Sequence, residues 1–198
     1  SRARVAQSRL AAFIKAAEAR WGRKLGDYPT LHRWSVEHLD EFWATVWDFT
    51  QVKGHRGGTV LQMGNTLPEA RWFPEARLNY AENLLRRRDE GTALVFRGED
   101  QVADRVSHGE LYRRVALLAA AMRAEGVVAG DRVAAYMPNL PETLIVMLAA
   151  ASIGAVFTSA SPDFGVQGVL DRFGQVAPKL LFVADGYFYN GKTLDCLE

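Results

Sequence analysis

Residues 161–165, SPDFG, combine side chains that could bind a ligand or cap a helix. They follow the apolar run AVFTS and precede a segment with helical periodicity. We therefore expect them at the carboxyl end of a buried strand, where open parallel sheets bind ligands. Free N–H groups at a helix start attract phosphate, but the Asp163 carboxylate would occupy those donors and repel an anion. We predict that Asp163 caps the helix. An anion site at this turn is the alternative.

Beyond this turn, the residues predict no catalytic or metal-binding set. The turn matches neither GxGxxG nor GxxxxGK[ST], the two common phosphate loops. The chain contains no GxSxG elbow and no HExxH motif, and its histidines are scattered singly. Glu99, Asp100 and Asp104 could suggest paired carboxylates, but they fall on a predicted hairpin and are interpreted as solvated turn charges.

The composition is that of a globular protein of 198 residues, of which 48% are hydrophobic and 24% charged. A net charge of +1 argues against nucleic-acid binding through bulk charge. The single cysteine, Cys196, cannot form an internal disulfide and fits a reducing cytoplasm. The longest apolar run is shorter than the ~20 residues that span a bilayer, and the N-terminal stretch lacks the pattern of a secretory signal. We therefore expect a cytoplasmic protein that binds neither nucleic acid nor membrane.

Two amphipathic helices are predicted in the first third of the chain. Apolar residues recur at helical spacing over 5–21, and Gly22 is expected to help end this helix. Ser35 is predicted to be the N-cap of a second helix, whose many aromatic residues would dock it on a larger body. The glycine-rich stretch 52–68 indicates a connection between elements.

The rest of the chain alternates strands and helices. A strand is predicted at 93–96, and residues 101–107 are either its hairpin partner or an extended approach to the next helix. Ser107 and Glu110 are expected to start that helix as a capping box. Further strands are predicted at 131–138, 155–161 and 179–185, with helices at 140–154 and 164–177 between them. Such repeats form parallel βαβ units with right-handed crossovers. The 140–154 helix is apolar on all sides and is therefore expected between layers.

These elements predict an α/β fold class. Residues 1–65 are assigned to a helical N-terminal extension and its connection. Residues 66–198 are assigned to the first part of a large α/β domain with parallel βαβ units. An apolar helix of this kind needs cover on every side, so this half of the chain is expected to belong to a larger body.

Several stretches carry a resemblance to a known family. GDRVAAYMPNLPETLIVMLAAASIGAVFTSASPDFG resembles the early part of the adenylate-forming acyl-CoA synthetases. SPDFGVQGVLDRFGQVAPKLLFVADGYFYNGK is similar to the narrower group of acetoacetyl-CoA synthetases. LHRWSVEHLDEFWATVWDF and RWFPEARLNYAENLL resemble the N-terminal extension of the same enzymes. The resemblance covers essentially the whole chain.

The resemblance implies a two-step ligase of fatty acid and ketone body metabolism. ATP and acetoacetate would give an acyl-adenylate and pyrophosphate, and coenzyme A would then displace AMP. Mg2+ would accompany ATP, because a metal that bridges phosphates offsets their charge. The family's phosphate loop, adenine contacts and catalytic lysine would all follow Glu198. The chain is therefore expected to hold no catalytic residue and no metal ligand, to be inactive alone, and to need the remainder of the same polypeptide.

The resemblance also implies a tentative site for coenzyme A. In related enzymes the loop at Ser161, Pro162, Asp163 and Phe164 borders the coenzyme A channel, and a basic residue at the position of Lys192 meets a phosphate. Here Pro162 and Asp163 replace paired glycines, and Lys192 lacks the planar fork that arginine presents to phosphate. Two nearby tyrosines, at 187 and 189, could pack against the sheet edge or against adenine.

Two other functions remain open from the sequence. The chain could belong to another short-chain acyl-CoA synthetase, because the residues that would select the acyl group are not recognisable in it. It could also be a non-catalytic binding module derived from the same lobe, for which polar outer faces would be expected.

Overall fold

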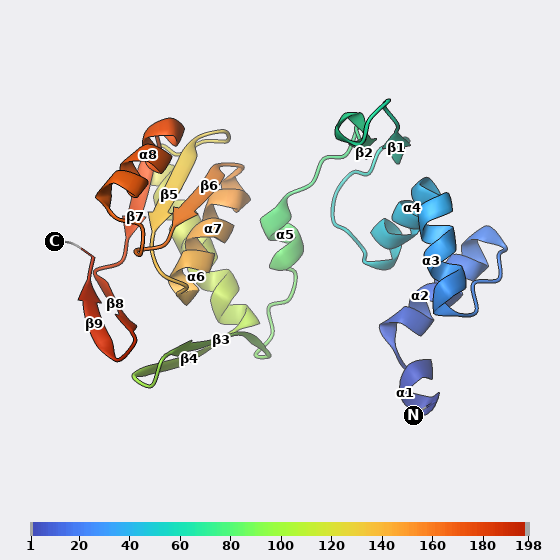
Figure 1. Cartoon of the computed structure of the whole chain (residues 1–198), viewed down its shortest axis with the longest axis horizontal. Helices are drawn as coiled ribbons and strands as arrows, with labels where there is room; N and C mark the ends of the chain where they lie inside the picture. The colour runs from blue at the N-terminus through green and yellow to red at the C-terminus, as the bar shows by residue number, and fades with distance from the viewer. Residues whose placement is uncertain (1, 197–198) are drawn as a thin grey trace. The chain divides into compact units, whose positions relative to one another are not determined.

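The computed structural model describes residues 2–196 and divides into two compact units (Figure 1). The first unit extends to Leu78 and the second begins at Asn79. The boundary predicted between residues 65 and 66 lies inside the first unit, and the domain assignment remains a prediction.

The first unit is built on an aromatic helical core. Its helices are α1 (Arg2–Ala6), α2 (Arg9–Trp21), α3 (Tyr28–Glu37) and α4 (Leu39–Phe49). The buried core consists of Phe13, Ala17, Leu25, Leu31 and Trp34. The Phe13 ring packs edge-on against the rings of Phe42 and Phe49, with centroids 5.8 and 5.2 Å apart. Edge-to-face pairs of this kind stabilise a core beyond the area that they bury.

Two of the predicted helix boundaries in this unit are wrong. The helix expected over 5–21 is broken, because Ser8 caps α2 by accepting a hydrogen bond from the Ala11 amide at 3.1 Å. Ser35 is not an N-cap: it lies inside α3, where its hydroxyl donates to the carbonyl of His32. Asp27 caps α3 instead. The predicted end at Gly22 is confirmed, since this residue adopts a left-handed φ of 63°.

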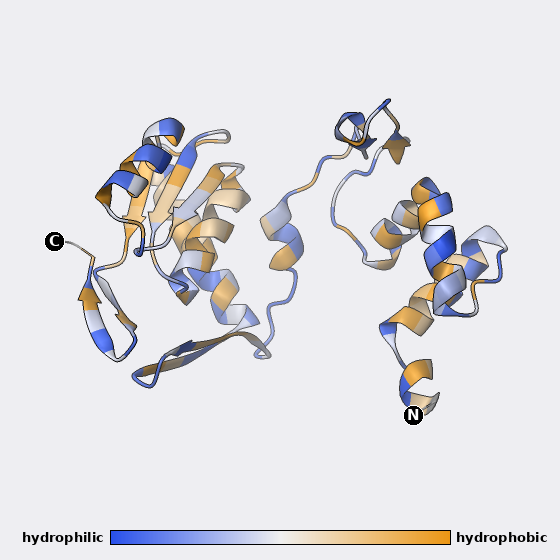
Figure 2. Ribbon diagram, in the orientation of Figure 1, coloured by the Kyte–Doolittle hydropathy of each residue, from blue (hydrophilic) through white to orange (hydrophobic). Residues whose placement is uncertain are grey.

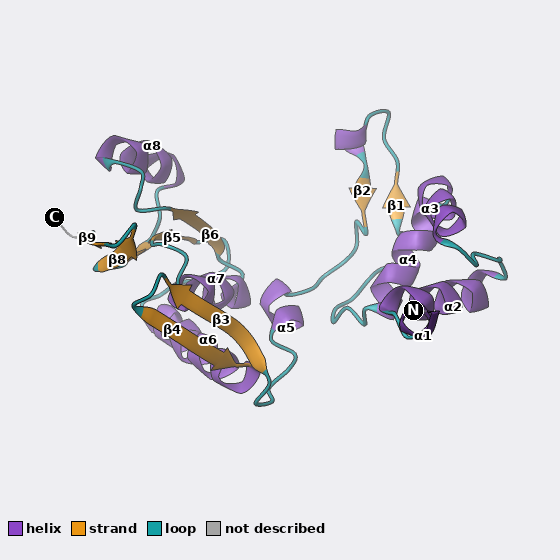
Figure 3. Cartoon of the chain, turned by 60° about the horizontal axis from the view of Figure 1, so that its bottom comes forward, coloured by secondary structure: helices purple, strands orange, loops and turns teal. Residues whose placement is uncertain are grey.

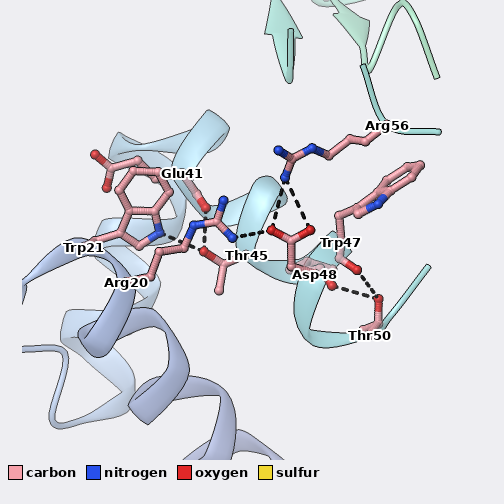
Figure 4. A network of polar contacts seen from close by, with 9 residues as sticks. Arg20, Trp21, Glu41, Thr45, Trp47, Asp48, Thr50 and Arg56 are labelled. Carbon is pink, nitrogen blue, oxygen red and sulfur yellow. Dashed lines mark hydrogen bonds and ion pairs between the residues drawn. The ribbon is translucent and has the colours of Figure 1, made fainter. Parts of the chain in front are cut away.

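A polar network joins α2, α4 and the segment after α4 (Figure 4). The Asp48 carboxylate accepts hydrogen bonds from the guanidinium groups of Arg20 and Arg56. Beside it, Trp21 Nε1 donates to Thr45 Oγ1 at 2.8 Å. Thr45 is 3% exposed, so its hydroxyl needs a partner within the protein. The bond supplies that partner and also satisfies the indole N–H of Trp21, which packs at the edge of the core.

The segment between α4 and α5 contains short elements that the sequence does not predict. These are β1 (Leu61–Gln62), η1 (Leu67–Glu69) and β2 (Arg71–Trp72), with β1 and β2 antiparallel. The Glu75 carboxylate accepts hydrogen bonds from the amides of Gly58 and Thr59, which fixes the loop. Within this unit, Trp43 of α4 packs against Trp72 with ring centroids 5.6 Å apart. The docking of the aromatic helix on a larger body remains a prediction.

The second unit is an α/β unit with two hairpins. It begins with α5 (Tyr80–Leu84), the antiparallel pair β3 (Thr92–Gly98) and β4 (Val102–Ser107), and α6 (His108–Ala124). It continues with β5 (Arg132–Tyr136), α7 (Pro141–Ile153), β6 (Val156–Ala160), α8 (Val166–Val176) and β7 (Leu180–Val183). It ends with a second antiparallel pair, β8 (Gly186–Tyr189) and β9 (Lys192–Asp195).

The central sheet is parallel, as predicted, with β5 between β6 and β7 (Figure 1). Successive side chains of a strand point to opposite faces of the sheet, so the residues of β5 pack alternately against the helices on its two sides. Val133 belongs to the core formed with α6 and α7, whereas Ala134 packs with Phe173 of α8. The expected α/β fold class is therefore confirmed.

Helix α7 occupies the middle of this core, as predicted from its apolar sequence (Figure 2). Ile145, Val146 and Leu148 are buried, and α7 packs against both α5 and α6. Gly154 ends the helix with φ 85°, and a Cβ there would lie 3.2 Å from the Cβ of Ala129. The position therefore combines a left-handed backbone with a close approach, and glycine suits both.

Candidate functional site

A cleft of about 570 Å3 opens at the carboxyl ends of β5 and β6. The β3–β4 hairpin and β8 form two of its walls, with the start of α7 and the turn after β6. Figure 3 shows where these hairpins and α7 lie in the chain. Its lining residues are 96–99, 102, 104, 137–143, 159–161, 163 and 186–189. Ligands bind at this end of the strands in open parallel sheets. The cleft is therefore the candidate site.

The turn after β6 is held by hydrogen bonds inside itself and from β5. Ser161 Oγ donates to Asp163 Oδ2 at 2.8 Å, and the Phe164 amide donates to the Ser161 carbonyl at 3.1 Å. The Tyr136 hydroxyl, at the end of β5, donates to the Pro162 carbonyl at 2.8 Å. The conformation of this turn is thus fixed by the strand beside it.

Asp163 does not cap α8, so this prediction is wrong. The N-cap of α8 is Gly165, which makes no side-chain capping bond. The Asp163 carboxylate turns instead to Tyr187, whose hydroxyl donates to Asp163 Oδ1 at 2.9 Å. This hydrogen bond to the carboxylate raises the pKa of Tyr187 to about 12, so its phenol stays protonated.

The structure brings together only part of the predicted coenzyme A site. Ser161 and Asp163 line the cleft, whereas Pro162, Phe164 and Lys192 are not among its lining residues. The Phe164 ring lies under the guanidinium of Arg172, 4.1 Å from the ring centroid. This cation–π contact holds the ring against α8.

Lys192 begins β9 and is exposed. It pairs directly with Tyr189 across the β8–β9 hairpin. Directly opposed residues share a face of a hairpin, and Tyr187 shares that face with Tyr189 because strand side chains alternate. Lys192 therefore lies on the face of the hairpin that carries the Asp163 contact.

The β8–β9 hairpin contains a phosphate-loop pattern. Residues 186–193, GYFYNGKT, match GxxxxGK[ST]. A true phosphate loop joins a strand to a helix, but here the pattern forms two antiparallel strands joined at Asn190 and Gly191. Both of these residues have positive φ, 51° and 71°, and Asn-Gly is the strongest short hairpin signal. The match is therefore a hairpin and not a nucleotide loop.

Glu99 is an exposed residue of the β3–β4 turn, as predicted, and it also holds the turn of the β8–β9 hairpin. Its carboxylate accepts hydrogen bonds from the backbone amides of Asn190 and Gly191, the latter at 2.9 Å. The donors that an anion would need at this turn are thus occupied by a carboxylate of the chain itself. No local pattern could reveal a contact between residues 92 positions apart.

The charged residues of the cleft are mostly acidic. Its lining includes the carboxylates of Glu99, Asp104, Glu142 and Asp163, and one guanidinium, that of Arg97. Tyr187, Phe188 and Tyr189 add aromatic surface. The interior of the cleft therefore suits apolar, aromatic or hydrogen-bonding groups better than bare phosphates.

Within residues 2–196, no group of three or more histidine, cysteine or acidic side chains is arranged to hold a metal ion. None of the helices in the described part of the chain is both long enough and apolar enough to span a bilayer.

Comparison with known proteins assigns the chain to a family. The profile of the family described as "AMP-binding enzyme" matches residues 81–196. The chain belongs to the AMP-binding enzyme family. A second profile, "Acetyl-coenzyme A synthetase N-terminus", matches residues 28–84, and the expected resemblance to this N-terminal extension is confirmed.

Two relatives of this AMP-binding family chain are named as acyl-CoA synthetases. It is 54% identical over 191 residues to the acetoacetyl-coenzyme A synthetase of Rhizobium meliloti, an alignment that covers 96% of the chain and 29% of that protein. It is 37% identical to a malonamoyl-CoA synthetase of Penicillium aethiopicum, over 91% of the chain and 26% of that protein.

A solved structure shows the same fold. The acetoacetyl-CoA synthetase from Streptomyces lividans matches with a TM-score of 0.90 and 46% identity, over 98% of this chain and 31% of that one. The chain thus spans less than a third of the length of each of these relatives.

Proposed function

We propose that the chain is the N-terminal part of an ATP-dependent acetoacetate–CoA ligase. The ligase would join acetoacetate to ATP as an acyl-adenylate with release of pyrophosphate, and then pass the acyl group to coenzyme A with release of AMP. The observation that carries this proposal is the match to an acetoacetyl-CoA synthetase structure at 46% identity over 98% of the chain. The proposal includes a cytoplasmic location, which the single cysteine fits.

The residues of this chain do not fit the ATP and Mg2+ part of the reaction. The described residues offer no cluster of metal ligands, and the one phosphate-loop pattern is a hairpin whose turn amides bind Glu99. We therefore assign adenylation, with its ATP and Mg2+, to the remainder of the same polypeptide. This chain alone is expected to be inactive.

The residues fit coenzyme A better. Coenzyme A supplies a thiol that accepts the acyl group, and it carries an adenine, a flexible arm and phosphates. The aromatic residues that line the cleft suit the adenine or the arm, whereas its carboxylates disfavour phosphate. Ser161 and Asp163 would border the bound cofactor, with Pro162 and Phe164 shaping their turn. Lys192, exposed outside the cleft lining, would meet a phosphate.

The first alternative is a ligase that uses a different short-chain acid in place of acetoacetate. The match to a malonamoyl-CoA synthetase at 37% identity supports another short-chain acid with the same ligase chemistry. A non-catalytic binding module is the other alternative. The exposed apolar residues of α8, including Val166 and Leu170, argue against it, because a stand-alone module would present polar faces.

The test is an assay of the full-length polypeptide that contains this chain. The protein would be supplied with ATP, Mg2+ and coenzyme A, and with acetoacetate, acetate or malonamate in separate reactions. Acyl-CoA formation with the highest kcat/KM for acetoacetate supports the proposal. A preference for malonamate or acetate establishes the rival ligase, and the absence of both acyl-CoA formation and acid-dependent ATP–pyrophosphate exchange contradicts ligase function. Residues 1–198 alone serve as the inactive control.

A further inference from the structure

We propose that Tyr187 is a positioning residue for the turn at 161–164 and acts through Asp163 when coenzyme A binds. The inference rests on the proposed function, because it concerns the same coenzyme A site. The family resemblance places the turn at 161–164 beside coenzyme A but does not involve a contact between Tyr187 and Asp163. Tyr187 enters through its hydrogen bond to Asp163, which joins β8 to the turn after β6.

The Asp163 carboxylate is held on both oxygens. Oδ1 accepts from the Tyr187 hydroxyl at 2.9 Å and Oδ2 accepts from Ser161 Oγ at 2.8 Å. With both oxygens engaged, the side chain is directed toward the hairpin and makes no capping bond to α8. Hydrogen bonds to an ionised carboxylate are among the stronger ones in proteins, so the contact fixes the side chain and the turn that carries it.

The hairpin that carries Tyr187 is anchored at its tip and closed at its base. At its tip, the amides of Asn190 and Gly191 donate to the Glu99 carboxylate. At its base, the Cys196 amide donates to the Asp185 carbonyl at 3.0 Å. Tyr187 therefore presents its hydroxyl from a supported strand, and the turn is held between this hydroxyl and that of Tyr136.

The start of α8 is an alternative partner for the Asp163 carboxylate, so the loss of the Tyr187 hydrogen bond is expected to change the turn. The N-cap of α8 is Gly165, without a side-chain capping bond. Asp163 lies two residues before this N-cap, and a helix start attracts negative charge. If the Tyr187 hydroxyl is removed, Asp163 keeps only its bond from Ser161 and can turn toward α8. The turn at 161–164 would then adopt another conformation, with its surface toward the cleft changed.

The experiment uses the full-length enzyme with the substitution Tyr187→Phe. We expect the KM for coenzyme A to rise roughly fivefold, the effect of losing about one hydrogen bond. Acetoacetate-dependent ATP–pyrophosphate exchange, which needs no coenzyme A, should keep its rate, and the Tm should change little. Tyr80→Phe is the matched control, because Tyr80 is 57% exposed on α5 and lies outside the cleft lining.

A double-mutant cycle separates positioning from a general structural role. Tyr187→Phe should raise the KM for coenzyme A in the otherwise unchanged enzyme but not in the Asp163→Ala background. An unchanged KM in Tyr187→Phe, an equal rise in both backgrounds, or an equal loss of exchange activity overturns the inference. In each of those cases the wild-type enzyme still makes acetoacetyl-CoA and the proposed function stands. A wild-type enzyme with no acetoacetate-dependent activity overturns both.

Discussion

The Glu99 carboxylate accepts a hydrogen bond from the Gly191 amide at 2.9 Å, across 92 positions of the chain. This bond ties the turn of the β3–β4 hairpin to the turn of the β8–β9 hairpin. Two hairpins that are separate in sequence thereby form the walls of one cleft. The cleft thus depends on a charged contact at its rim as well as on the packing of its core.

Glu99→Gln should loosen the β8–β9 turn. The amide oxygen still accepts a hydrogen bond, but the charge that strengthens the bond is lost. We expect amide hydrogen exchange at Gly191 to become roughly fivefold faster, because such bonds contribute on the order of 1 kcal/mol. Asp100→Asn, at the next position of the same turn, is the matched control. Unchanged exchange at Gly191 in the Glu99 variant would show that the contact does not hold the turn.

Leu148→Ala should strongly destabilise the second unit. Leu148 is 1% exposed at the centre of α7, so its truncation leaves a cavity. We expect the free energy of unfolding to fall by about 2–5 kcal/mol, measured by urea denaturation. Leu117→Ala on α6 removes the same atoms from a residue that is 59% exposed and should change it by less than about 0.5 kcal/mol. Similar losses in both variants would contradict the central position of α7.

Glu110 should give the α6 N-terminus an acid-sensitive stability. Hydrogen bonds from Arg113 and then Arg114 lower the pKa of the Glu110 carboxyl from 4.5 to about 2. Since the folded pKa is depressed, the stabilisation is fully present above pH 4.5 and is lost as the pH falls toward about 2. A carboxyl-detected NMR titration would check this, and Arg113→Gln should move the midpoint upward. A midpoint near 4.5 in the unchanged protein would refute the pairing.

Residues 1–198 in isolation should bind a hydrophobic dye or self-associate. Val166 and Leu170 are 78% and 60% exposed and lie four residues apart on α8, so they form one apolar stripe. Dye binding would be measured by fluorescence and self-association by sedimentation. Leu170→Gln should reduce both. Leu170→Met, which keeps an apolar side chain at the same position, is the control. A cooperative monomer without dye binding would count against the fragment proposal.

The periodicity of the sequence predicted the centre of the second unit well. The strands and helices from β5 to β7 occur in the predicted order because their cores are built from local apolar patterns. The all-round apolar helix and its end at Gly154 are likewise local signals. Boundaries in the first unit were less accurate. Ser35 has the residue type of a cap, but Asp27 followed by Pro29 starts the helix earlier.

The candidate site could be predicted only in part, because its contacts are long-range. The turn at 161–165 was located at the end of β6, but the role of Asp163 was wrong. Its partner Tyr187 lies 24 positions away on a hairpin that was not predicted. The Asn190–Gly191 pair, flanked by strand-forming residues, was a usable signal for that hairpin. The contact between Glu99 and its turn had no such signal.

The order of the strands in the central sheet has a consequence for the synthesis of this segment on the ribosome. Within residues 2–196 no strand pairs with the outer edges of β6 and β7. Open strand edges are templates for pairing with other chains. During translation of a longer polypeptide, this segment would leave the ribosome with those edges and the apolar stripe of α8 uncovered. Slow or stalled synthesis would lengthen that interval and favour aggregation on polysomes, and chaperones that shield nascent chains would set the yield of the finished protein.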